Sequence, residues 1–267
     1  CNSSGNNSSR LFSFESKTKE KQKIGLSFKV MKIGILLVGW ASDELVERYG
    51  SYADMLRKLI DSEEQVFEFK TYNILRSEFP ESHLDCDGWI VTGSPHGVYE
   101  EHSWIPTVSQ LIKNIYHDKL PIFGVCFGHQ LIAQTLGGHV EKSTKGWGLG
   151  LHTYNIDKSA NYLDNLSEEL TLNICHQDQV LQLPENATLY ASSEFCENAG
   201  FYIEDKVLTM QAHPEFKIDF TEALLNARRE VIIPKEFTDP ALKKLKEVPE
   251  SVQSSQFAQT IRQFFLS

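Results

Sequence analysis

Short apolar runs alternate with amphipathic stretches from about residue 31 onward, and this alternation predicts a series of strands and helices. The continuous apolar run Ile122–Val125 is typical of a strand that is buried on both faces. Trp104–Tyr116 has apolar residues three or four positions apart, which is typical of a helix packed on a sheet. The other elements predicted in this first half are strands at Ile33–Val38, Gln65–Tyr72 and Cys86–Thr92, and helices at Tyr49–Asp61 and from residue 127 to Gly137 and Gly138.

After Gly138 the pattern changes to short strand-like runs without long helices between them, which favours antiparallel pairing. Two helices, Phe220–Val231 and Ser254–Phe265, are predicted near the end, with a mobile connection over residues 233–252 between them. The fold class predicted is α/β and flavodoxin-like, with a mostly parallel sheet, helices on both faces and an antiparallel extension. The strands of that extension are predicted at Leu151–Ile156, Leu170–Cys175, Thr188–Ser192, Gly200–Ile203 and Val207–Ala212.

The first thirty residues differ in kind from the rest of the chain. They are rich in Ser and Asn and then in charged residues, so they cannot bury an apolar face. We expect residues 1–30 to be a disordered N-terminal extension, residues 31–231 to be the folded domain, and residues 232–267 to be a C-terminal connection and a helix packing on it. For the extension itself, a simple tail, a targeting segment and a lipid-anchored tether beginning at Cys1 all remain open, and Met31 could be an initiator.

Charge and cysteine usage narrow the classes of function. The formal net charge is −10, and no basic patch is visible beyond the N-terminus, so nucleic acid is not an expected partner. No stretch is long and apolar enough to predict a membrane span. Five cysteines show no paired spacing, which indicates free thiols in a reducing compartment, and we therefore expect a cytoplasmic protein.

One cysteine lies in a pattern that a buried strand does not need. Cys126 stands between Gly124 and Gly128, at the predicted turn from a strand into a helix. Small residues on both sides allow a sharp turn that presents one side chain, which is the geometry of a nucleophile elbow. A helix N-terminus favours the thiolate form, and the Phe127 N–H, together with that of Gly93 at the end of the neighbouring predicted strand, could stabilise an oxyanion. The sequence therefore predicts a cysteine nucleophile.

A thiolate nucleophile needs a base, and the base needs a group that orients it. His213 follows a predicted strand and is followed by Pro214 and Glu215. Because proline ends strand pairing and fixes the backbone, Glu215 can turn back towards the imidazole. We therefore predict that Cys126, His213 and Glu215 form a catalytic triad.

Four segments, "TGSPHG", "GVCFGHQ", "ICHQD" and "QAHPEF", occur in this order, and through them the chain resembles the class I glutamine amidotransferase family. Within that family it is similar to stand-alone members, to the amidotransferase domain of GMP synthetase and to plant γ-glutamyl peptidases. The resemblance implies that Cys126 is the nucleophile, His213 the general base and acid, and Glu215 its orienting partner. It also implies oxyanion donors at Gly93 and Phe127 and a substrate pocket that includes Gln130, His176 and Asp178.

No cofactor or metal is expected. His96, His102 and His129 do not form a metal-ligand spacing with any cysteine, and "TGSPHG" lacks the lysine of a phosphate-binding loop. Trp147 could shape the rim of the site or serve only in packing. We expect the other cysteines of the predicted domain to be core or inert surface residues; they are Cys86, Cys175 and Cys196.

The resemblance implies cleavage of a γ-glutamyl amide through a γ-glutamyl thioester, and three roles stay open. The first is a stand-alone hydrolase of γ-glutamyl peptides or glutamine. The second is a glutaminase subunit that delivers ammonia to a separate synthetase partner. The third is a regulatory protein that has lost catalysis, although the complete set of Cys126, His213 and Glu215 argues against it. The polar loop His96–Trp104 lies where a leaving group would exit, and it favours the stand-alone hydrolase.

Overall fold

The computed structural model describes residues 30–61, 66–247 and 252–267. The chain divides into two units, Cys1–Val30 and Met31–Ser267, and the architecture below is that of the second. The predicted N-terminal extension, apart from Val30, and the Gln65 start of a predicted strand lie outside the described residues. The strands are β1 Met31–Leu37, β2 Phe67–Asn73, β3 Gly88–Val91, β4 Ile122–Val125, β5 His139–Lys142, β6 Gly148–Ile156, β7 Glu169–His176, β8 Asp178–Gln182, β9 Thr188–Ser192, β10 Gly200–Ile203 and β11 Val207–Met210.

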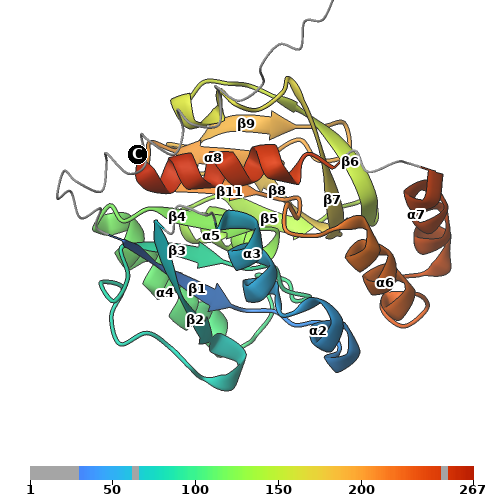
Figure 1. The fold of residues 1–267 in the computed structure, drawn as a ribbon, viewed down its shortest axis with the longest axis horizontal. Coiled ribbons are helices and arrows are strands. Elements are labelled where there is room, and N and C mark those ends of the chain that lie inside the picture. Colours follow the sequence, from blue (N-terminus) through green and yellow to red (C-terminus); the bar gives the residue numbers. More distant parts are fainter. Residues whose placement is uncertain (1–29, 62–65, 248–251) are drawn as a thin grey trace, which may run out of the picture. The chain divides into compact units, whose positions relative to one another are not determined.

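Seven α-helices and two short 3₁₀ helices occur in the described residues (Figure 1). None of these helices is long and apolar enough to cross a membrane. They are α2 Asp43–Tyr49, α3 Tyr52–Ile60, η1 Ile74–Arg76, α4 Trp104–His117, α5 Phe127–Thr135, η2 Asn161–Leu163, α6 Ile218–Arg228, α7 Lys235–Glu247 and α8 Ser254–Leu266.

Nine of the described strands form one sheet, in the order β2-β1-β3-β4-β11-β10-β9-β6-β7. The five strands from β2 to β11 pair in parallel, whereas the pairs from β11 through to β7 are antiparallel. A separate antiparallel pair is formed by β5 and β8. The predicted fold, a mostly parallel sheet with an antiparallel extension, is confirmed.

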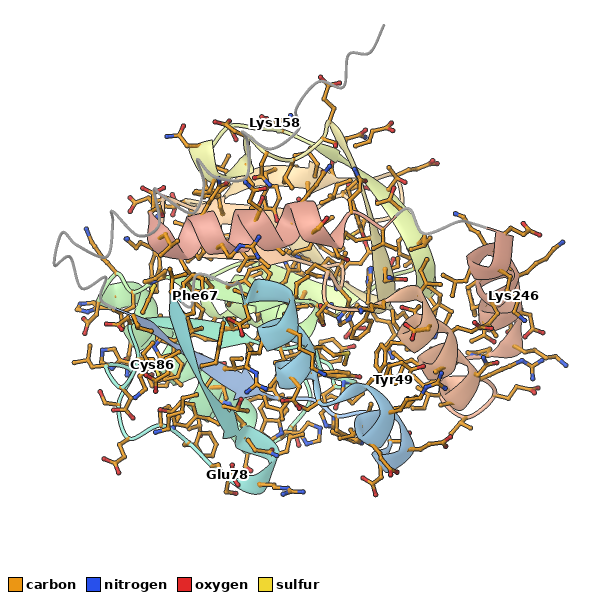
Figure 2. All side chains as sticks on the ribbon, viewed as in Figure 1. Tyr49, Phe67, Glu78, Cys86, Lys158 and Lys246 are labelled. Atoms are coloured by element: carbon orange, nitrogen blue, oxygen red, sulfur yellow. The ribbon has the colours of Figure 1, made fainter. Side chains whose placement is uncertain are left out.

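Two clusters of buried apolar side chains lie on the two faces of this sheet, and Figure 2 draws the side chains on the ribbon. Along β1, Ile33 and Ile35 belong to one buried cluster, which includes residues of α3 and α8, while Leu36 belongs to a second, which includes residues of α4 and α5. Successive side chains of a strand point to opposite faces, so a strand covered on both faces must be apolar throughout. This explains the continuous apolar runs of the first half.

Two local predictions were wrong. The helix predicted over Tyr49–Asp61 is interrupted at Gly50, whose φ of 88° ends α2, and Ser51 then begins α3 with a reciprocal capping pair to Asp54. The connection predicted over residues 233–252, of which residues 248–251 lie outside the described residues, contains the helix α7. Its Phe237, with Ala241 and Leu245, forms a stripe four residues apart that packs beside β6. Pro240 lies in the middle of the segment, and because proline disfavours a helix interior, the sequence did not predict a helix here.

Candidate active site

The carboxyl ends of three neighbouring parallel strands carry the central residues of the site. Strand β4 lies between β3 and β11, and Gly93, Cys126 and His213 follow β3, β4 and β11 respectively. Parallel strands end at the same edge of a sheet, so residues far apart in sequence meet there. The structure therefore brings together the three predicted residues at the end of one sheet.

Cys126 has a backbone conformation that L-amino acids rarely adopt. Its φ is 50° and its ψ is −101°, and it lies directly between β4 and α5. Its N–H donates to Met210 O at 2.8 Å, and its own carbonyl accepts from Gln130 N at 3.0 Å. These bonds join the turn to β11 on one side and to the first turn of α5 on the other. A non-glycine residue in this region carries about 1–3 kcal/mol of strain, which the surrounding structure must offset.

The glycines on either side of Cys126 allow close packing at the turn. A Cβ atom on Gly124 would lie 2.7 Å from the backbone of Gly128, and one on Gly128 would collide with the carbonyl of Val91 at the end of β3. The positive φ is on the cysteine itself, so the glycines serve the approach of α5 to β3 and β4. This refines the sequence interpretation, in which the small residues were expected to allow the sharp turn.

His213 and Glu215 form a buried pair behind Cys126. His213 Nδ1 lies 2.7 Å from Glu215 Oε1, and the two side chains are only 4% and 0% exposed. On its other side the imidazole lies close enough to Cys126 for the sulfur to raise the pKa of His213. Because Nδ1 faces the carboxylate, Nε2 is the nitrogen that faces the sulfur. The three predicted residues therefore form a continuous chain from sulfur through imidazole to carboxylate.

Electrostatics favour the protonated form of this histidine. Burial by itself lowers the pKa of His213, but the Glu215 carboxylate and the Cys126 sulfur oppose this and raise the pKa to about 10. The arrangement can thus supply a proton donor directly beside the Cys126 sulfur.

The predicted oxyanion residues flank the sulfur. A Cβ atom on Gly93 would lie 2.7 Å from His213 Cε1 and 3.7 Å from Cys126 Cβ, so the backbone of Gly93 lies against both side chains. Phe127 is the first residue of α5, where N–H groups have no partner within the helix. Backbone N–H groups from two strand ends are therefore available on either side of Cys126.

The predicted substrate residues are joined to one another through the backbone of Asp178. Its carbonyl accepts from Gln130 Nε2 at 2.8 Å and from His176 Nδ1 at 3.0 Å. Gln130 Nε2 also donates to Gln211 Oε1 at 3.0 Å. Both amide hydrogens of Gln130 are thus used within the protein, which leaves its carbonyl oxygen to meet a substrate.

Burial shifts the pKa values of the two ionisable members of this group in opposite directions. Burial lowers the pKa of His176 to about 3, so this imidazole is neutral at pH 7. Burial also raises the pKa of Asp178, while a hydrogen bond from the Tyr99 hydroxyl opposes the rise. The Asp178 carboxylate faces the loop after β3, since a Cβ atom on Gly97 would lie 3.1 Å from its Oδ2. Asp178 therefore lies where β8 meets the loop that begins at Gly93.

Residues 44–227 match the family model of glutamine amidotransferase class-I. The chain belongs to the class-I glutamine amidotransferase family. Gamma-glutamyl peptidase 3 of Arabidopsis thaliana is 31% identical over 222 residues, which cover 79% of this chain and 87% of the peptidase. GMP synthase of Finegoldia magna is 36% identical over 129 residues, covering 48% of this chain and 24% of the synthase. A crystal structure of a glutamine amidotransferase from Thermotoga maritima shares the fold, with a TM-score of 0.73 at 20% identity over 89% of this chain and 99% of that one.

Asn173 is a site residue of this class-I amidotransferase that sequence analysis missed. Its backbone carbonyl accepts from His213 N at 2.8 Å, and its side-chain Nδ2 donates to Phe216 O at 2.8 Å. Phe216 in turn stacks on the imidazole of His213, with ring centroids 3.9 Å apart and an angle of 4°. Asn173 lies inside β7, three residues before His176. It pairs with His213 in the turn after β11, and this pairing cannot be recognised from the sequence around Asn173.

The structure also places the other residues that the sequence singled out. Trp147 is partly buried and packs against the apolar core next to β6. Cys86, Cys175 and Cys196 are free and buried, in agreement with the expected core role. His129 is buried, and its Nδ1 lies 2.9 Å from Thr209 Oγ1. His96 and His102 lie instead in the loop between Gly93 and α4, where both contact Glu100.

Proposed function

We propose that this protein is a cysteine-dependent hydrolase that cleaves γ-glutamyl amide bonds, and that it acts as a stand-alone enzyme of the γ-glutamyl peptidase type. One observation carries the proposal: His213 lies between the Cys126 sulfur, which raises its pKa, and the buried carboxylate of Glu215, which is 2.7 Å from its Nδ1. Membership of the class-I amidotransferase family and the similarity to a γ-glutamyl peptidase support the substrate class.

In the first half of the reaction, Cys126 Sγ attacks the γ-carbonyl carbon of the substrate. The carbonyl oxygen becomes an oxyanion that accepts hydrogen bonds from the N–H groups of Gly93 and Phe127. His213 gives its Nε2 proton to the leaving nitrogen, the carbon–nitrogen bond breaks, and a γ-glutamyl thioester remains on Cys126. The raised pKa of His213 suits this step, because the imidazolium is the form that can donate the proton.

In the second half, the neutral imidazole that results takes a proton from water. The hydroxide attacks the thioester carbon, the carbon–sulfur bond breaks, and glutamate leaves while Cys126 returns to the thiolate. Glu215 keeps His213 in the tautomer that presents Nε2 to the sulfur throughout, since its carboxylate accepts from Nδ1.

Three residues that meet at the Asp178 carbonyl recognise the glutamyl group: Asp178 itself, Gln130 and His176. The Asp178 carboxylate suits an α-ammonium group, and the carbonyl oxygen of Gln130 can accept a further hydrogen bond from the same group. His176, neutral and buried, has an Nε2 lone pair and holds the Asp178 carbonyl through Nδ1. This division of roles assigns ligand contact to Asp178 and Gln130 and positioning to His176.

A second candidate function, the glutaminase subunit of a two-component synthetase, is favoured by the match to part of GMP synthase. The loop on the leaving-group side favours the stand-alone hydrolase. Tyr99 in that loop is 52% exposed, and its neighbours Glu100, Glu101 and His102 are polar. A permanent partner interface is usually apolar at its centre, whereas this loop offers a polar rim to an incoming peptide.

Steady-state kinetics of the purified chain test the proposal. We expect a γ-glutamyl dipeptide to have a higher kcat/KM than glutamine, and Cys126→Ser to lose the activity on both. Mass spectrometry of the acid-quenched wild type should detect the glutamyl adduct on Cys126. A clear preference for glutamine would replace the peptidase with the subunit, and full activity of Cys126→Ser would overturn the mechanism.

A further inference from the structure

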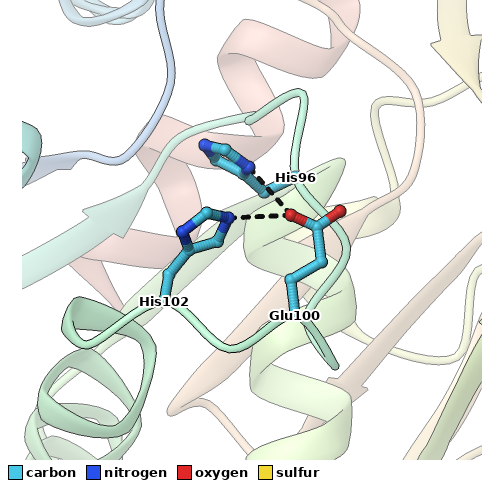
Figure 3. Close-up of side chains that lie close together, drawn as sticks. All are labelled: His96, Glu100 and His102. Carbon is cyan, nitrogen blue, oxygen red and sulfur yellow. Dashed lines mark hydrogen bonds and ion pairs between the residues drawn. The ribbon is translucent and has the colours of Figure 1, made fainter.

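Three side chains of the loop between β3 and α4 meet around one carboxylate oxygen (Figure 3). His96 Nδ1 lies 2.9 Å from Glu100 Oε2, and His102 Nε2 lies 2.8 Å from the same oxygen. One ligand atom from each residue lies within 4.8 Å of the others. Two imidazoles and one carboxylate thus converge from a single short segment, outside the Cys126 centre.

The chemistry of this donor set indicates a first-row transition metal. Imidazole nitrogen is a preferred ligand of Zn²⁺, whereas Mg²⁺ and Ca²⁺ favour oxygen ligands, of which this cluster offers a single carboxylate. Two histidines and one glutamate are also a known zinc ligand set in proteins, with a water or a further group in the fourth position.

The distances are close to those of a tetrahedral zinc site. Metal–ligand bonds of about 2.0–2.1 Å place two ligand atoms roughly 3.3 Å apart. The Glu100–His96 and Glu100–His102 separations of 2.9 and 2.8 Å would therefore need to open by about half an ångström. Glu100 is already oriented for this, because its other oxygen, Oε1, accepts from Gly97 N at 2.9 Å.

The cluster is open to solvent. The side chains of His96, Glu100 and His102 are 20%, 41% and 36% exposed, so an ion can enter and water can complete its coordination. We propose that His96, Glu100 and His102 bind Zn²⁺ and that the bound ion fastens the loop that borders the active site.

Two contacts connect this loop to the site. The His102 ring stacks on Trp104, with centroids 6.0 Å apart, and Trp104 packs on Phe127, the residue after Cys126, at 5.5 Å. Gly97, which lies between the metal ligands in sequence, is close to both Tyr99 and Asp178, since a Cβ atom on it would lie 2.8 Å from Tyr99 Cζ and 3.1 Å from Asp178 Oδ2. An ion that joins His96 to Glu100 and His102 would therefore restrict the segment that covers the substrate wall.

This inference revises the expectation that the chain has no zinc site. No cysteine in the sequence stands at a metal-ligand spacing from His96 or His102. The third ligand is a glutamate instead, and the turn at Gly97 brings it back towards His96. The spacing His96-x₃-Glu100-x-His102 does not by itself place the three side chains together; the conformation of the loop does.

The test measures zinc binding in a background in which the catalytic thiol cannot contribute. The full chain carrying Cys126→Ala is stripped with a chelator and titrated with Zn²⁺ against a chromogenic competitor, and Co²⁺ absorption serves as a spectroscopic probe. His102→Gln and Glu100→Gln remove ligands. His139→Gln is the matched control. His139 is also exposed and lies 2.7 Å from a glutamate, Glu141, but it does not belong to the cluster of two histidines and one glutamate.

We expect one Zn²⁺ per chain, an affinity at least about tenfold weaker in both ligand variants, and no change in His139→Gln. The visible Co²⁺ bands should disappear with His102→Gln. Hydrogen exchange of residues 94–103 should slow when Zn²⁺ is added to the parent but not to His102→Gln. Equal affinity in the parent and the ligand variants would overturn the site, and unchanged exchange in a zinc-loaded parent would overturn the fastening of the loop. Neither readout depends on hydrolysis.

Discussion

Nδ1 of His213 lies 2.7 Å from Oε1 of Glu215, in a pair that is almost fully buried. The carboxylate raises the pKa of the imidazole against the opposing effect of burial. Such a pair fixes both the orientation and the charge of His213 beside Cys126.

Replacing Glu215 with Gln should move the alkaline limit of activity to lower pH. The raised pKa of His213, about 10, means that the proton donor is present below this pH and is lost above it. The amide removes the charge that contributes to the rise, so His213 should lose its proton at lower pH in the variant. The pH profile of kcat/KM measures the shift, and the apparent pKa belongs to the coupled Cys126–His213 pair. An unchanged alkaline limb would contradict this electrostatic role of Glu215.

Cys126→Gly should be more stable than Cys126→Ala, although both should be inactive. The φ of 50° at this position strains any L-residue, and glycine removes the strain. We expect a difference of about 1–3 kcal/mol in the free energy of unfolding, measured by denaturant titration. A more stable alanine variant would show that the turn carries no strain.

Gly93→Ala should reduce kcat/KM by about 100-fold or more, because the added methyl group displaces the imidazole. A Cβ atom there would lie 2.7 Å from His213 Cε1. Ser94→Ala, one residue along the same loop, is the control and should retain most of the activity. Steady-state kinetics on the best substrate decides this, and equal activity of the two variants would argue against close packing of Gly93 on His213.

Asn173→Ala should destabilise the fold by about 1–3 kcal/mol and also slow turnover. The substitution removes the hydrogen bond that Asn173 Nδ2 donates to Phe216 O. The Phe216 ring, which stacks on the His213 imidazole, is then held less firmly. Asn226→Ala is matched to it, since Asn226 Nδ2 also donates to a backbone carbonyl, that of Glu222, but at the surface. The control should change stability by less than about 0.5 kcal/mol. Normal turnover in Asn173→Ala would show that Asn173 does not position the turn that carries His213.

Local patterns in the sequence were sufficient for the class of fold and for the centre of the site. The run Ile122–Val125 and the helix after Cys126 predicted the turn between them, because both signals are short-range. The pair His213 and Glu215 is separated by a single proline, so its meeting is also local. The helix α7 was missed because a proline in its sequence outweighed an apolar stripe that has meaning only against β6.

Tertiary structure decided which distant residues share one place. The parallel order β3-β4-β11 brings Gly93, Cys126 and His213 to one edge, and pairing of β7 with the turn after β11 places Asn173 beneath His213. The same applies to His96, Glu100 and His102, whose spacing matches no cysteine-based metal pattern and whose loop conformation makes them a cluster. Strand pairing and loop closure join residues across gaps that no local periodicity spans, because the bonds that select them form only once the sheet exists.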